Sequence, residues 1–246
     1  MEWTARAIVL GTRRHGETSL IADLLSGAEG RYKGLVRGGA SRRLRGVLEP
    51  GNLVSATWRA RLPEHLGTVT AELLQANAAS VMADKVALAA LAAACTLVAR
   101  CLPERQPHSR LYEGLLALFD ILCRLPGEAL VWGPAYVRWE AGFLAELGFG
   151  LDLSCCAVTG AMEGLAFVSP RSGRAVSADG AGDYRDRLLP LPAFLLDSGA
   201  EASPAALCHG LNLTGFFITE RLLRPFDKAL PQARERLCRY LETAVN

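Results

Sequence analysis

In the first third of the chain, short runs rich in β-forming apolar residues alternate with turns containing glycine. The β-like runs cover residues 5–10, 19–25, 32–37, 53–59 and 68–74. Evenly spaced short runs of this kind are typical of small barrels. Five strands in about seventy residues therefore predict a small closed or partly open barrel, either a five-stranded Greek-key barrel of the OB type or an SH3-like barrel.

From residue 77 onward, apolar residues recur at helical spacing. The pattern predicts helices over 77–102, 109–125 and 134–147, another from 203, and a last one over 231–244. Pro134 is expected in the first turn of its helix, and Gly148 is expected to end it. Tyr136, Trp139 and Phe143 fall at helical spacing and are expected in the core rather than as platforms for base stacking.

A short β and turn segment interrupts the helical region between residues 154 and 180. It has the layout of a zinc knuckle without the ligands, because a tetrahedral site needs four Cys or His at paired short spacing. Cys155 and Cys156 are adjacent, and the positions that would complete the site hold Thr159, Ser177 and Gly180. We therefore expect neither zinc nor any other cofactor.

Charge is distributed unevenly along the chain. Residues 1–61 carry eleven Lys and Arg against five Asp and Glu, a net charge of +6, whereas the remainder carries 16 against 20, a net charge of −4. A basic head on a mildly acidic body is typical of a protein in which one module meets a polyanion.

The basic residues concentrate around a glycine-rich loop that carries three arginines in four residues. Clustered guanidinium groups repel one another unless an anion meets them, and a nucleic-acid backbone is the expected partner. Arginines and a lysine also alternate with a period of two along the preceding strand and are expected on one sheet face. The candidate nucleic-acid contacts are Arg13, Arg14, Arg31, Lys33, Arg37, Arg42, Arg43 and Arg45. Trp58 is expected in the core or between domains rather than on a base.

The motifs of the common enzyme classes are missing from the sequence. The four histidines are scattered, and no phosphate-binding Gly-rich loop, Gly-x-Ser-x-Gly or His-Glu-x-x-His occurs. Seven isolated or unpaired cysteines indicate a reducing cytoplasm, and the most apolar stretch, residues 86–98, is too short to span a membrane. A nucleic-acid binder is favoured over an enzyme, with an RNA-binding barrel or a protein adaptor for acidic tails as alternatives.

Several segments together resemble the bacterial recombination mediator RecO family. They are Arg6-Ala-Ile-Val-Leu, Gly16-Glu-Thr-Ser-Leu, Gly30-Arg-Tyr-Lys-Gly-Leu-Val-Arg-Gly, Leu44-Arg-Gly-Val-Leu-Glu-Pro-Gly, and the stretch from Val137 to Phe149 that leads into Cys156-Ala-Val-Thr-Gly. The resemblance covers essentially the whole chain in the family's order. At the zinc ligands the chain departs from the family, since only Cys156 aligns with an expected cysteine.

The resemblance implies an α+β protein with an OB-fold DNA-binding domain over residues 1–76 and a helical domain over 77–246. Within the latter, residues 152–192 would form a degenerate zinc-finger-like insert. Similar proteins act in the RecF pathway of DNA repair and homologous recombination: they bind single- and double-stranded DNA, anneal complementary strands and assist RecA loading. The implied partners are DNA, RecR, the C-terminal tail of single-stranded-DNA-binding protein and, indirectly, RecA. The implied location is the bacterial nucleoid in the cytoplasm. The resemblance implies no catalytic activity.

Overall fold

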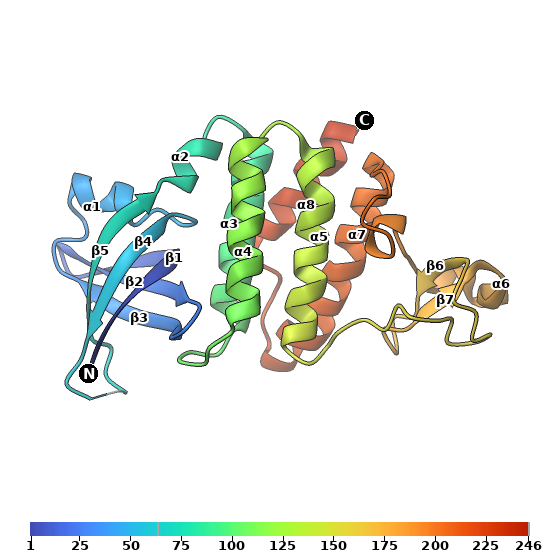
Figure 1. Cartoon of the computed structure of the whole chain (residues 1–246), viewed down its shortest axis with the longest axis horizontal. Coiled ribbons are helices and arrows are strands. Elements are labelled where there is room, and N and C mark those ends of the chain that lie inside the picture. The colour runs from blue at the N-terminus through green and yellow to red at the C-terminus, as the bar shows by residue number, and fades with distance from the viewer. Residues whose placement is uncertain (63, 246) are drawn as a thin grey trace. The chain divides into compact units, whose positions relative to one another are not determined.

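The computed structural model describes residues 1–62 and 64–245. Its contacts divide the chain into two compact units, Met1–Gly127 and Glu128–Asn246, both of which are drawn in Figure 1. The first is mixed α and β, and the second is mainly helical. Within the described residues, no helix is both long enough and apolar enough to cross a membrane.

Five strands near the N-terminus close into a barrel, at the positions that the alternating pattern predicts. They are β1 (Glu2–His15), β2 (Ser19–Ser26), β3 (Gly30–Val36), β4 (Leu53–Arg59) and β5 (Thr68–Gln75). Their order around the barrel is β1-β2-β3-β5-β4, and β4 pairs with β1 to close it. All neighbouring strands are antiparallel except β3 and β5, which are parallel and meet only where Leu35 pairs with Thr68. The junction between β3 and β5 is therefore the least paired part of the barrel wall.

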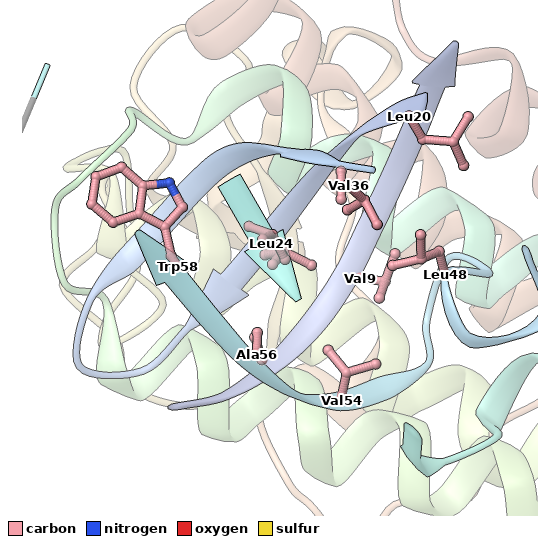
Figure 2. Packing of buried hydrophobic residues seen from close by; sticks show 11 residues of the cluster. Val9, Leu20, Leu24, Val36, Leu48, Val54, Ala56 and Trp58 are labelled. Atoms are coloured by element: carbon pink, nitrogen blue, oxygen red, sulfur yellow. The ribbon is translucent and has the colours of Figure 1, made fainter. Parts of the chain in front are cut away.

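Alternate side chains of these strands fill the barrel. Figure 2 shows Val9, Leu24 and Val54 pointing inward, with Leu48 close to Val9. Trp58 is 1% exposed, and its indole N–H donates to the carbonyl oxygens of Lys33 and Leu66, at 3.1 and 3.0 Å. The prediction that Trp58 belongs to the core is therefore confirmed.

Three helices follow the barrel in the first unit: α2 (Asn77–Val81), α3 (Lys85–Cys101) and α4 (Ser109–Arg124). The prediction of one continuous helix over residues 77–102 is wrong, because the chain breaks before Asp84. The carboxylate of Asp84 accepts from the N–H groups of Val86 and Ala87, both at 2.8 Å, and so caps the start of α3.

The second unit is built on α5 (Ala129–Glu146), α7 (Pro204–Phe217) and α8 (Gln232–Val245), with a π-helical turn, Ile218–Leu223, after α7. Pro134 lies inside α5 rather than in its first turn, so the predicted helix start is wrong; α5 loses one internal hydrogen bond there. Tyr136, Trp139 and Phe143 are buried, which confirms their assignment to the core.

A small sheet interrupts the helices of the second unit. It consists of β6 (Leu165–Val168), β7 (Ala175–Ser177) and β8 (Leu189–Pro190) in the order β7-β6-β8. Two short helices, α6 (Ala178–Ala181) and η1 (Gly182–Arg187), lie between β7 and β8 in the chain. All of these elements lie within the insert predicted over residues 152–192. The predicted domain boundary lies between residues 76 and 77, after the last strand of the barrel. The boundary between the two compact units lies after Gly127, so α2, α3 and α4 belong to the same unit as the barrel.

Candidate nucleic-acid interface

The predicted glycine-rich loop contains a short helix, α1 (Arg42–Val47). The prediction of an open loop is therefore wrong for these residues. Ser41 caps the helix by accepting from the N–H of Leu44, and Leu48, at the other end, is 2% exposed and packs into the barrel core. Because the capped and anchored helix fixes the backbone, the exposed Arg42, Arg43 and Arg45 project from a defined scaffold.

One groove lies between α1 and the barrel wall at β5, and we call it the β5 groove. Its volume is about 470 Å³, and Arg37 and Arg43 line it together with Leu44. The opposite wall is strand β5 from Thr68 to Glu72, and the floor includes Leu35 and Val36. Arg37, at the end of the predicted strand, and Arg43, in the predicted loop, thus line one cavity. Nothing in the sequence predicts that residues of β5 line this groove.

A second groove lies between α1 and the β1–β2 hairpin, and we call it the hairpin groove. Its volume is about 220 Å³, and Arg14 and Arg45 line it together with Thr12 and Glu49. The N–H of Ala40 donates to the carbonyl oxygen of Thr18 at 3.0 Å, which ties the chain before α1 to the tip of the hairpin. Arg13 is exposed next to Arg14, on the same hairpin.

Six of the eight candidate residues are exposed, and their guanidinium groups make no hydrogen bond or ion pair with any residue that the structure describes. They are Arg13, Arg14, Arg37, Arg42, Arg43 and Arg45. Unpaired, exposed guanidinium groups on two sides of one short helix form a surface suited to phosphates, because they can displace the counterions of a nucleic-acid backbone.

Arg31 and Lys33 have a different environment. The guanidinium of Arg31 donates to both carboxylate oxygens of Asp23, at 2.9 and 2.7 Å, and to the carbonyl oxygen of Leu102 at 2.8 Å. Lys33 pairs with Glu104 at 2.6 Å. Partial burial would raise the pKa of Glu104, but its hydrogen bond with Lys33 lowers it overall. These two cations fasten the segment after α3 to the barrel, and this geometry does not support Arg31 as a phosphate contact.

Replacing Arg31 by alanine should destabilise the first unit without changing the salt dependence of DNA binding. The Arg31 and Asp23 side chains are only 10% and 15% exposed, so the substitution leaves a largely buried carboxylate without its partner. Hydrogen bonds to charged groups contribute about 1.5–3 kcal/mol, and we expect a loss in that range in a denaturant titration. A normally stable R31A variant with a reduced salt slope would instead return Arg31 to the candidate nucleic-acid interface.

Cys156 lies at the centre of the insert, where the resemblance places a zinc ligand. It is 1% exposed, and its sulfur accepts from the N–H and hydroxyl of Ser177, at 3.2 and 3.3 Å, and from the N–H of Thr159 at 3.4 Å. A Cβ at Gly180 would lie 2.9 Å from this sulfur, so the sulfur is closely surrounded. Groups of three or more metal-ligating side chains do not occur within the described residues, and this set of neighbours does not fit zinc.

The hydrogen bonds around Cys156 predict a pH-dependent insert. Burial raises the pKa of the thiol, but the donors from Ser177 and Thr159 lower it overall, to about 6. Because the pKa of the folded state is below the unfolded value, the thiolate stabilises the insert above the unfolded pKa, and this contribution is lost as the pH falls through about 6. Hydrogen-exchange protection factors of residues 152–192 should therefore be larger at pH 9 than at pH 5. A C156A variant should lack this trend.

Family models and known proteins match nearly the whole chain. A family model described as Recombination protein O N terminal matches residues 1–77, and one described as Recombination protein O C terminal matches residues 82–230. The chain is 52% identical over 239 residues to the DNA repair protein RecO of Rhodospirillum rubrum, which covers 96% of this chain and 94% of that protein. It is 48% identical over 245 residues to the DNA repair protein RecO of Cereibacter sphaeroides, with coverage of 99% and 100%.

Proposed function

The chain belongs to the recombination protein O family of DNA repair proteins, and from this premise we propose that it is a recombination mediator of the RecF pathway. In this proposal it binds single- and double-stranded DNA, anneals complementary strands and assists RecA loading together with RecR. It acts at the bacterial nucleoid, in the cytoplasm, where its DNA substrate lies.

The observation that carries the proposal is the set of six exposed, unpaired arginines around α1, on a barrel with the strand order β1-β2-β3-β5-β4. This order supports an OB fold, an architecture that binds single strands. Arginines that neutralise phosphates give affinity independent of sequence and leave the base edges free to pair. A protein that neutralises two backbones at once lowers the repulsion between them, which is the physical requirement for annealing.

The partners in this proposal follow from the family. RecR and the C-terminal tail of single-stranded-DNA-binding protein would bind directly, and RecA would be affected through them. That tail is acidic and apolar, and we propose that it docks on the helical domain. The protein would need no nucleotide and no catalytic residue.

We also propose that the insert is a zinc ribbon that has lost its metal. Support comes from Cys156, whose sulfur is already satisfied by Ser177 and Thr159. Elemental analysis of the purified protein should find less than stoichiometric zinc, and a chelator should leave its circular dichroism unchanged. One zinc per chain, lost together with folded structure on chelation, would contradict this proposal.

The deciding experiment is annealing of complementary oligonucleotides with and without single-stranded-DNA-binding protein. Annealing should proceed in both cases without ATP, and ATP should not be hydrolysed. Competition among single-stranded DNA, duplex RNA and an acidic peptide separates the alternatives, because an RNA-binding barrel or an adaptor would prefer the second or third competitor. Protein-dependent phosphate release that survives rigorous purification would favour an enzyme.

A further inference from the structure

We propose that α1 separates two distinct single-strand tracks, the β5 groove and the hairpin groove, so that one chain holds two DNA strands at the same time. This inference rests on the proposed DNA-binding function and specifies how annealing would be organised. Each groove holds two of the unpaired arginines: Arg37 and Arg43 in the β5 groove, and Arg14 and Arg45 in the hairpin groove.

The separation follows from the geometry of α1. Arg43 and Arg45 are two residues apart, which corresponds to about 200° around a helix, so they project from opposite sides. The lining residues agree with this, since Arg43 and Leu44 line the β5 groove whereas Arg45 and Leu48 line the hairpin groove. Residues two positions apart on a helix do not face each other, and Arg43 and Arg45 accordingly line different grooves. Arg43 and Arg45 of the sequence cluster therefore belong to two different surfaces rather than to one.

The β5 groove has a further feature suited to an extended chain. Strand β5 pairs with β4 over its whole length but with β3 only at Thr68, where the N–H of Leu35 donates to the carbonyl oxygen of Gly67 at 3.0 Å. Backbone groups alternate in direction along a strand, so those of Ala71, four residues after Gly67, face the same side. Beyond the single bridge, β3 does not pair with this edge. The N–H of Ala71, which lies in the lining of the groove, is therefore placed to donate to a phosphate or base oxygen.

Each groove also contains one carboxylate, Glu72 in the β5 groove and Glu49 in the hairpin groove. Two arginines and one glutamate leave a net charge of +1 in each track. The affinity of a single track is therefore modest. Weak holding is compatible with annealing, because the paired product must leave both tracks.

The number of strands bound per chain tests the proposal directly. We would use poly-dT oligonucleotides about six nucleotides long, which cannot pair with one another and match the short sites of such barrels. Native mass spectrometry should find two oligonucleotides per wild-type chain. An R37A/R43A variant and an R14A/R45A variant should each bind one, and the quadruple variant should bind none.

Affinity and annealing supply the second measurement. Loss of two phosphate contacts should weaken the altered track about 25-fold at 0.1 M salt, while the other track keeps its affinity. The annealing rate should fall by a similar factor in each double variant, although one of the two tracks still binds DNA. Glutamine variants should raise the affinity instead. E72Q should raise the DNA affinity of the β5 groove alone, and E49Q that of the hairpin groove alone. Arginine-to-glutamine versions of the double variants serve if an alanine version is poorly folded.

The outcomes separate this inference from the proposed function. One oligonucleotide per wild-type chain, weakened by both double variants, would mean a single continuous track and would overturn the inference while leaving DNA binding intact. Unchanged stoichiometry and annealing in R37A/R43A would also overturn it and would leave the β5 groove for another ligand, such as an acidic peptide. Absence of any DNA binding by the wild-type protein would overturn the proposed function itself.

Discussion

Replacing Glu140 by alanine should lower the free energy of unfolding of the second unit by about 3–5 kcal/mol, the usual cost of breaking a buried ion pair from one side. Glu140 and Arg234 are both 0% exposed and form two hydrogen bonds, at 2.6 and 2.9 Å, and Thr214 donates to the same carboxylate. Burial lowers the pKa of Arg234, but Glu140 raises it overall, so the arginine stays charged. Urea unfolding followed by hydrogen exchange of α5, α7 and α8 would measure the loss.

Two variants control this prediction. Arg224 forms an exposed ion pair with Glu220, with the arginine side chain 70% exposed, and R224A should cost at most about 1 kcal/mol. An E140M/R234M variant replaces both charges with apolar side chains, and such replacements often restore the stability lost in the single variants. If E140A is as stable as R224A, the buried pair does not hold α5, α7 and α8 together.

The strands were predictable from the sequence because each strand of this barrel has one face in the core. In β4 the two-residue alternation from Val54 to Arg59 follows from that burial. Strand β2 is buried on both faces over most of its length and is visible instead as a short apolar run between turns. The helix breaks were less predictable. After α2 ends at Val81, Asp84 caps the start of α3 through its side chain, which the long alanine-rich pattern obscures.

The sequence predicts the candidate nucleic-acid interface as a region but does not show the environment of each residue in it. The sequence concentrates basic residues near α1, yet nothing local distinguishes Arg31 from Arg37. The difference arises from Asp23 on the neighbouring strand and from Leu102, which is 71 residues away in the chain. Because the tertiary fold brings these partners to Arg31, a period of two predicts its place on β3 but not its pairing with Asp23 and Leu102.

The arginines of α1 should supply a large share of the affinity for single-stranded DNA. On a long single strand that occupies both grooves at once, replacing Arg42, Arg43 and Arg45 by alanine should reduce the salt slope by about 0.7 per lost phosphate contact, or about 2 in total if each arginine neutralises one phosphate. At 0.15 M salt this corresponds to an affinity loss of roughly 50-fold. The loss should be similar for different sequences, because phosphates carry no base information. Fluorescence anisotropy over a range of salt concentrations would measure both quantities.

Thermal unfolding of the same triple variant decides between binding and structural roles. All three side chains are exposed and make no ion pair with described residues, so each substitution should change stability by no more than about 0.5 kcal/mol. A matched variant with Arg171, Arg185 and Arg187 of the second unit replaced by alanine loses the same charge and should keep the wild-type salt slope. A lowered melting temperature with an unchanged slope would assign the α1 arginines to the fold. An unchanged slope in a normally folded variant would remove α1 from the DNA-binding surface.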